Sequence, residues 1–377
     1  MSEYQYVAFR AIDGPVSESN LKFMEKQSSR AEITPWSFEN EYHFGDFRGD
    51  AGAMLRRGYD FHFHYANFGI RKLMIRLPNG LPDAKAAAPY LKKRGAQFSK
   101  DNDGPGGILS IEPFFEAGEL EDLWELDGVL DRLLALREEI LGGDLRPLYL
   151  AHVAIASDSN HDPEEEKSAP VPAGLGKLSD AQQALAELYG LSEALIAAAA
   201  QNAPALPEHS NVQNRYAEWI GRQPEATKND WIARLMADPR SAVRREILAE
   251  FQKSKFTTNW PTAPVDRTIA ELHAAAEEVQ QELDRKRAEK ATRQRAKKLS
   301  DMATDPTKTL RKTEELVKQR STASYRETAT LLADLRDALA GSADPDLPEK
   351  HARKLTAAHP TLRVLTSELR RKGFLKK

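Results

Sequence analysis

Residues 40–69 read NEYHFGDFRGDAGAMLRRGYDFHFHYANFG, and they contain the clearest strand pattern in the chain. In residues 61–66, FHFHYA, aromatic side chains alternate with His62 and His64. Residues 34–44 alternate in the same way, with aromatic side chains on one face and polar side chains on the other. A period of two is typical of β-strands, because successive side chains point to opposite faces of a sheet. Both segments therefore predict strands that bury an aromatic face.

Strands and helices alternate through the whole N-terminal part. Further strands are expected in residues 71–78, RKLMIRLP, and in residues 108–115, ILSIEPFF. Helical periodicity marks residues 17–27 and residues 120–143, and the second of these segments ends at two glycines. Strands interleaved with helices predict an α+β domain over residues 1–157, with a ferredoxin-like arrangement as one candidate.

The rest of the chain is expected to be helical. Residues 158–177 have no apolar periodicity and contain prolines and an acidic cluster, so they predict an acidic, proline-containing linker. Amphipathic patterns predict a helical subdomain over residues 178–256, in which DPRSAVRREIL is similar to one helix of a HEAT repeat. Residues 265–377 predict a long charged helix followed by C-terminal helices.

The composition limits the classes of function. The chain has 377 residues, a formal net charge of −3 and 29% charged residues, which is typical of a soluble globular protein. It has no cysteine, so disulfides, thiol nucleophiles and cysteine-ligated zinc or iron–sulfur sites are excluded. No apolar run is long enough to span a bilayer, and the N-terminus lacks a signal-peptide pattern. We therefore expect a cytoplasmic protein without a membrane partner.

The two histidines of residues 61–66 define one candidate site. His62 and His64 are two residues apart on one strand, so their side chains project from the same face. Two imidazoles at that spacing can bind one metal ion, and His43 or Asp46 could complete a facial set of ligands. The alternative is that these histidines belong to the polar face of a strand whose other face is buried. A metal-dependent enzyme centred on His62 and His64 is therefore one hypothesis, and a structural role is the other.

Common catalytic signatures are absent from the chain. It has no GxxxxGK[ST], GxGxxG, HExxH or GxSxG pattern, so the usual nucleotide-binding, zinc-protease and serine-hydrolase motifs are missing. We therefore expect an interaction protein rather than an enzyme, with no resident cofactor.

The strongest local charge feature is the run RKRAEKATRQRAKK at residues 285–298, which has eight cations and one acidic residue. The cations are Arg285, Lys286, Arg287, Lys290, Arg293, Arg295, Lys297 and Lys298. One reading is a solvated helix with pairs such as Glu282 and Lys286, and the other is contact with nucleic-acid phosphates. No Phe, Trp or Tyr occurs between Trp260 and Tyr325, so stacking on bases is not expected.

The helix that carries this basic run is expected to change character at Leu283. Apolar residues keep a three–four spacing up to Leu283, and the same spacing then meets Lys286, Lys290, Arg293 and Lys297. Burying unpaired cations is far costlier than leaving them in water. The first part of the helix should therefore pack within its own domain, and the second part should be exposed.

Two segments resemble a known family. Residues 30–78, which contain AEITP, NEYHFGDFRG and YANFGIRKLMIRLP, resemble a family of uncharacterised bacterial proteins that are commonly encoded beside SWIM-type zinc-finger proteins. Residues 215–251 resemble the C-terminal half of the same family. The resemblance implies an accessory role beside a zinc-finger partner, and it supplies no catalytic residues. We therefore expect a non-enzymatic accessory protein of a multi-component bacterial system, with nucleic-acid binding through residues 285–298 and a metal-dependent activity as the alternatives.

Overall fold

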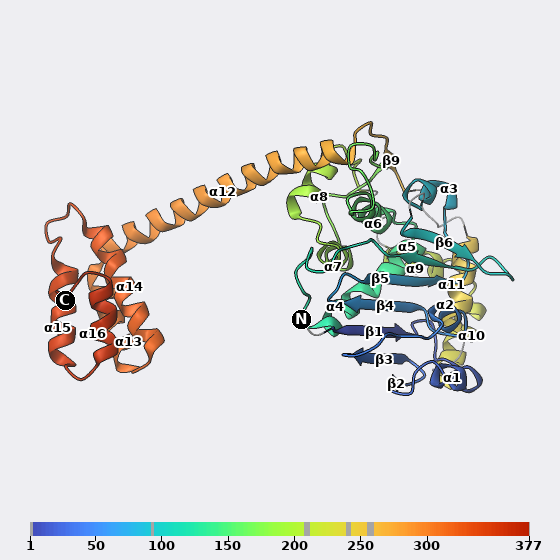
Figure 1. Ribbon diagram of the computed structural model, residues 1–377, viewed down its shortest axis with the longest axis horizontal. Coiled ribbons are helices and arrows are strands. Elements are labelled where there is room, and N and C mark those ends of the chain that lie inside the picture. The colour runs from blue at the N-terminus through green and yellow to red at the C-terminus, as the bar shows by residue number, and fades with distance from the viewer. Residues whose placement is uncertain (1–2, 92–93, 207–211, 239–242, 255–259, 377) are drawn as a thin grey trace. The chain divides into compact units, whose positions relative to one another are not determined.

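The computed structural model divides the chain into two compact units, residues 1–280 and residues 281–377. The residues that it describes are 3–91, 94–206, 212–238, 243–254 and 260–376. All strands described lie in the first unit, and every element described in the second unit is a helix (Figure 1). This order confirms the predicted fold class, an α+β part followed by a helical part.

One antiparallel sheet of seven strands organises the first unit (Figure 1). Its strand order is β2-β3-β1-β4-β5-β7-β6, and every neighbouring pair is antiparallel. In that order the strands are Glu32–Ile33, Ser37–Tyr42, Gln5–Arg10, Phe61–Ala66, Arg71–Leu77, Gly107–Ile111 and Ala96–Lys100. The segments predicted above as strands therefore form β3, β4, β5 and β7, and β4 lies at the centre of the sheet.

The ferredoxin-like candidate accounts for only part of this sheet. The strands β5 and β6 are connected through α3 (Ala84–Ala87), run parallel, and have β7 between them, which makes a split β-α-β unit. A second split unit consists of β3, α2 (Ala51–Arg56) and β4, with β1 between its strands. Because β4 and β5 pair, the two units form one sheet of seven strands rather than a four-stranded domain.

Each face of the sheet carries a hydrophobic core. The aromatic side chains of β4 lie in the larger core, as the alternation predicts. His62 projects from the opposite face and stacks on Phe9 of β1, in a smaller core that includes Met24 of α1 (Glu18–Glu25) and Met54 of α2. Around His62 that face is therefore not a solvated polar face, because α1 and α2 supply apolar side chains that cover it.

Five helices build the larger core against the first face of the sheet. These helices, α4 to α8, are Leu126–Leu133, Ala135–Leu141, Arg146–Ala156, Asp180–Leu188 and Glu193–Ala200. Every residue of α6 is buried, so α6 is the centre of this layer. Ser179 begins α7 with a capping box, in which its hydroxyl accepts from the backbone of Gln182 and the Gln182 side chain accepts in return.

Residues 168–175, in the second half of the segment 158–177 expected to form an exposed linker, pack into the same core. Four alternate side chains from Ala169 to Leu175 are at most 5% exposed. The strand β8 (Val171–Pro172) also pairs with β9 (Thr262–Ala263). Residues 168–175 are therefore not a solvated linker, because small and apolar residues alternate with proline and glycine here, and this short extended pattern buries one face. The boundary expected at residue 157 therefore lies inside a compact unit.

The helical subdomain expected over residues 178–256 is not separate from the sheet domain either. Arg244 donates to Asp13, 3.2 Å away beside the end of β1, and Arg215 donates to a backbone carbonyl just after α5. These arginines lie on the first and last of three helices, α9 to α11, which are Val212–Gly221, Glu225–Ala237 and Val243–Lys253. The HEAT-like segment includes residues 239–242, which lie outside the described residues.

A buried ion network joins α5 to the sheet. Arg137 is fully buried, and its guanidinium donates to both carboxylate oxygens of Asp13 and approaches Asp60. Burial raises the pKa of Asp60, and the nearby Arg137 opposes this effect. A buried charge without its partner costs several kcal/mol, so this network stabilises the fold only as a complete set.

The long helix α12 (Ile269–Thr304) extends from the first unit into the second. Ile269 and Leu272 are fully buried and Leu283 is half-buried, whereas the cations from Arg285 onward are exposed, so the predicted change of character is confirmed. Four further helices, α13 to α16, complete the second unit: Pro306–Lys318, Thr322–Leu339, Leu347–Ala358 and Arg363–Arg371. None of the helices described is long and apolar enough to cross a membrane.

Candidate functional site

His62 and His64 of β4, the first candidate site, form hydrogen bonds to other groups of the protein. His62 is 1% exposed, and its Nδ1 atom lies 3.1 Å from the carbonyl oxygen of Ala8. Its ring stacks on Phe9 with the centroids 4.1 Å apart. Burial, with a smaller contribution from His64, lowers the pKa of His62 to about 3. The ring is therefore neutral near pH 7 and acts as a packed aromatic side chain.

The other members of the proposed metal set are only partly brought together. The Nε2 atom of His64 lies 2.9 Å from Oε1 of Gln5, and the Gln5 amide donates to Asp46 at 2.8 Å. His43 contacts the ring of Tyr4 instead. Burial lowers the pKa of His64 to about 4. Within the described part of the chain, no group of three or more His, Asp or Glu side chains is placed to hold a metal ion.

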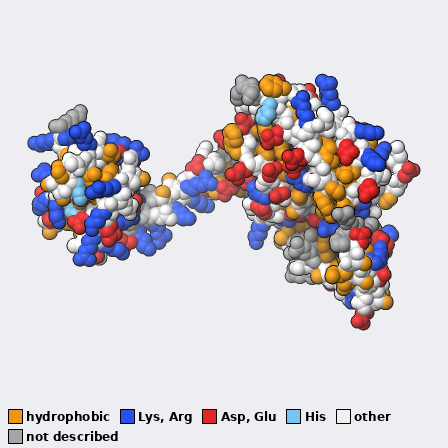
Figure 2. Space-filling model, turned by 90° about the horizontal axis from the view of Figure 1, so that it is seen from below, with side chains coloured by type: hydrophobic (Ala, Val, Ile, Leu, Met, Phe, Trp, Pro, Cys, Tyr) orange, Lys and Arg blue, Asp and Glu red, His pale blue; other side chains and the backbone are white. Residues whose placement is uncertain are grey.

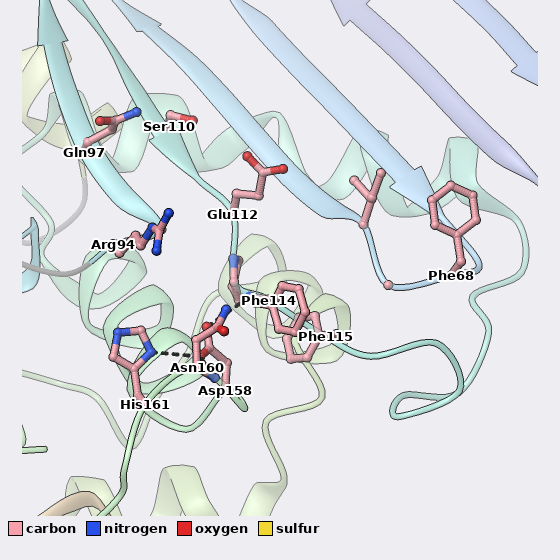
Figure 3. Close-up of a pocket in the computed structure, with 14 residues that line it drawn as sticks. Phe68, Arg94, Gln97, Ser110, Glu112, Phe114, Phe115, Asp158, Asn160 and His161 are labelled. Carbon is pink, nitrogen blue, oxygen red and sulfur yellow. Dashed lines mark hydrogen bonds and ion pairs between the residues drawn. The ribbon is translucent and has the colours of Figure 1, made fainter. Parts of the chain in front are cut away.

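A cavity of about 650 Å³ lies elsewhere in the first unit (Figure 3). The strands β6 and β7 contribute Gln97 and Ser110, and Glu112 follows directly after β7. The segment after α6 contributes Asp158 and His161. Small-molecule sites typically have volumes of about 300–1,000 Å³. The size and the mixed polar lining of this cavity are therefore suitable for a small ligand.

Asp158 and His161 form a hydrogen-bonded pair at this cavity (Figure 3). Asp158 is 3% exposed, and its Oδ1 atom lies 2.8 Å from Nδ1 of His161. The same carboxylate accepts from the backbone N–H groups of Phe114 at 3.0 Å and Asn160 at 2.9 Å. An ionised carboxylate only accepts hydrogen bonds, so it selects the form of His161 that has a proton on Nδ1. The Nε2 atom then remains for a ligand, since it bonds to none of the described residues.

Two further charged side chains differ in how they are paired. Arg94 lines the cavity, is exposed, and makes no ion pair or side-chain hydrogen bond with any of the described residues. Glu112 accepts instead from Lys72, with Oε2 and Nζ 2.8 Å apart. The guanidinium of Arg94, which pairs with no described residue, is therefore the cation that an incoming anion could pair with most readily.

Aromatic side chains and tight backbone contacts form the other wall. Phe68, Phe114 and Phe115 line the cavity, and Phe114 is 49% exposed (Figure 3). Gly69 has a φ of +112°, and a Cβ atom at this position would lie 2.1 Å from the carbonyl oxygen of Phe115. Only glycine fits this close approach, so the turn between β4 and β5 is held directly against the segment that carries the two phenylalanines.

The sequence contains a signal for this cavity within residues 158–177, which the linker interpretation did not use. Asp158 and His161 are three residues apart, at the start of the segment expected to be a linker. This spacing alone does not identify a site, because the strands that supply Gln97 and Ser110 are far away in sequence. Only the fold brings them together.

The basic run forms a separate candidate surface in the second unit. Five of its eight cations have acidic partners: Arg285, Lys286 and Arg287 pair within α12, and Arg295 and Lys298 pair with α14. The other three, Lys290, Arg293 and Lys297, are exposed and form no ion pair with a described residue. Their three–four spacing places them on one face of the helix, which we call the basic stripe.

The charge of the chain is distributed unequally between the two units. Residues 281–377 contain 24 Lys and Arg against 14 Asp and Glu, a formal net charge of +10. Residues 1–280 contain 30 against 43, a net charge of −13, so the total of −3 conceals a strong asymmetry. Figure 2 shows many Lys and Arg side chains on the helical C-terminal unit.

Comparisons with known proteins return no match. No protein-family model, no curated protein and no solved structure is significantly similar to this chain. Its function must therefore be argued from its own surfaces.

Proposed function

We propose that the protein is a non-enzymatic interaction protein whose C-terminal unit binds the phosphates of nucleic acid. The observation that supports this best is the basic stripe, Lys290, Arg293 and Lys297, on a unit with a net charge of +10. Unpaired exposed cations can pair with phosphates without first breaking an ion pair, and they release the counterions that surround the nucleic acid.

The length of the basic stripe suits a nucleic-acid backbone. Seven residues separate Lys290 from Lys297, which corresponds to about 10 Å along a helix. Phosphates of one DNA strand advance about 3.4 Å per base pair along the duplex axis, so the stripe spans about three phosphate positions. The five paired cations of the run are partly neutralised by their acidic partners, so we expect each of them to contribute less to nucleic-acid binding.

A neighbouring groove extends the same surface. Lys297 lines a groove of about 910 Å³ together with Lys308 and Arg311 of α13, and these two also form no ion pair with a described residue. Asp301 and Glu315 line the groove too, so its charge is mixed. The groove gives the phosphate backbone further partners beyond the end of the basic stripe.

We expect binding to depend little on base sequence. No Phe, Trp or Tyr occurs on α12 or α13, so the residues that most often stack on bases are absent from both helices. Fluorescence anisotropy with labelled duplexes of two unrelated sequences tests this expectation. The proposal requires similar affinities for both duplexes and a steep loss of affinity as salt is added. A lack of binding at low salt would contradict it.

A protein partner is the second candidate, and it matches the accessory role that the resemblance implies. The helix α10 has no buried residue, and it exposes Ile232 by 59% and Met236 by 80%. Apolar side chains that are exposed together are typical of protein interaction sites. Affinity purification of the tagged protein together with its encoded neighbours tests this role. A Met236→Glu variant should lose the partner, whereas a Lys228→Glu variant on the same helix should retain it.

A further inference from the structure

We infer that the cavity between β6, β7 and residues 158–161 binds a small molecule that has one anionic group on a planar apolar body. This inference is independent of nucleic-acid binding, because the cavity belongs to the first unit and the basic stripe to the second. Three features of the cavity carry the argument: a free cation, a histidine held in one orientation, and an aromatic wall.

The polar wall offers two groups that no described residue engages, the guanidinium of Arg94 and the Nε2 atom of His161. The guanidinium of Arg94 lacks an ion-pair partner among the described residues, and its planar fork matches a phosphate or a carboxylate. His161 is fixed through Nδ1 by Asp158, whose buried carboxylate is itself held by two backbone N–H groups. A rigid histidine loses little freedom when a ligand binds its Nε2 atom, and this preorganisation favours binding.

The apolar wall selects for the rest of the ligand. Phe68, Phe114 and Phe115 line the same cavity, and half of the Phe114 side chain is in contact with solvent. A planar body against these rings would cover exposed apolar surface, and aromatic pairs add a favourable contribution beyond simple burial. A bare anion would use only the polar wall, so it should bind more weakly.

One carboxylate of the cavity opposes an anionic ligand. Glu112 is negatively charged, but one of its oxygens is bonded to Lys72, so the pair is close to neutral. Asp158 already accepts hydrogen bonds from His161 and two backbone N–H groups. Arg94 is therefore the charged side chain that a ligand meets, and it favours an anionic ligand. A cationic ligand would have to use Glu112 in competition with Lys72.

Calorimetric titration of the full chain with phenyl phosphate tests the inference, with inorganic phosphate and benzylamine as comparison ligands. We expect phenyl phosphate to bind more tightly than either of them. Removing one charge-assisted pair with Arg94→Gln should weaken binding about 10-fold to 100-fold. The His161→Gln variant should weaken binding as well, and Lys85→Gln, an exposed cation outside the cavity, should leave it unchanged.

A fourth variant separates this inference from the proposed function. Lys290→Gln, Arg293→Gln and Lys297→Gln together should retain phenyl phosphate binding, and Arg94→Gln should retain nucleic-acid binding. Histidine-selective NMR adds a local readout, because the ring resonance that is lost in His161→Gln should be the one that shifts with phenyl phosphate. The inference is overturned if benzylamine binds as tightly as phenyl phosphate, if Arg94→Gln binds normally, or if no histidine resonance of the first unit responds.

Discussion

Replacing Lys290, Arg293 and Lys297 together by Gln is the sharpest test of the basic stripe. The three side chains are exposed and form no ion pair with a described residue, and Gln has nearly the same helix propensity as Lys and Arg. Surface substitutions of this kind usually change the free energy of unfolding by no more than about 0.5 kcal/mol. We therefore expect the thermal unfolding midpoint of the variant to match that of the wild type.

The effect on binding can be calculated from the number of phosphates that the basic stripe reaches. Each neutralised phosphate of duplex DNA contributes about −0.9 to the slope of log K against log salt, so three contribute about −2.7. Between about 50 and 200 mM salt, these three contacts lower the affinity of the wild type roughly 40-fold. The triple variant lacks the three contacts, so this part of the salt dependence should be absent from it. Fluorescence anisotropy with a labelled duplex over that salt range measures both slopes.

A control with the same change in net charge separates local contact from general attraction. Arg353, Arg363 and Arg370 are exposed on α15 and α16 of the same unit and form no ion pair with a described residue. Replacing all three by Gln should change the salt slope far less, because exposed charges are screened over about 10 Å at 0.1 M salt. The reasoning is refuted if the two triple variants lose the same affinity, or if the slope of the basic-stripe variant equals that of the wild type.

Three predictions concern the stability of the first unit, and urea unfolding measures each. The pKa of His62 is about 3 when folded and about 6.5 when unfolded, so the unfolded state binds the extra proton between these values. The stability that neutral His62 supplies is complete above about pH 6.5 and is lost as the pH falls towards 3. The free energy of unfolding of the His62→Gln variant should therefore depend less on pH over that range than that of the wild type. An equal pH dependence in both proteins would contradict this reasoning. Asp13→Ala should lower the free energy of unfolding by about 3–5 kcal/mol, because it leaves the buried guanidinium of Arg137 without its main partner. A loss below about 1 kcal/mol would mean that the remaining groups of the network rearrange to compensate the charge. Leu175→Ala should lower the free energy of unfolding by about 2–5 kcal/mol because Leu175 is fully buried. The control Lys177→Ala changes an exposed residue and should have little effect on the free energy of unfolding. Equally small losses in both variants would support the linker interpretation.

The sequence predicts the strands well wherever one residue pattern decides the structure. The alternation in residues 61–66 identifies β4 and the face that enters the larger core. It cannot show that α1 and α2 cover the opposite face, because Met24 and Met54 come from segments whose contacts depend on the whole sheet. His62 is therefore buried by tertiary packing, and its own strand pattern predicts a polar face.

The candidate cavity could not be predicted for a related reason. Its polar wall combines Arg94 before β6, Glu112 after β7 and His161 after α6, and these segments meet only because β6 and β7 pair at the edge of the sheet. The proline-rich composition of residues 158–177 also pointed to an extended, solvated chain, although four alternate side chains from Ala169 to Leu175 are buried. Composition averages over a segment, whereas burial depends on which face of it meets a neighbour.

The helix α12 shows when sequence alone is sufficient. One three–four spacing continues through the helix, with apolar residues up to Leu283 and cations at Lys290, Arg293 and Lys297. The helical geometry is the same in both parts, so the chemistry of the side chains decides which part is buried. A buried neighbour would have to compensate three unpaired cations, and none of the described residues supplies that compensation. The face that packs in the first unit therefore continues in the second as a solvated basic surface, which is the surface that we expect nucleic-acid phosphates to contact.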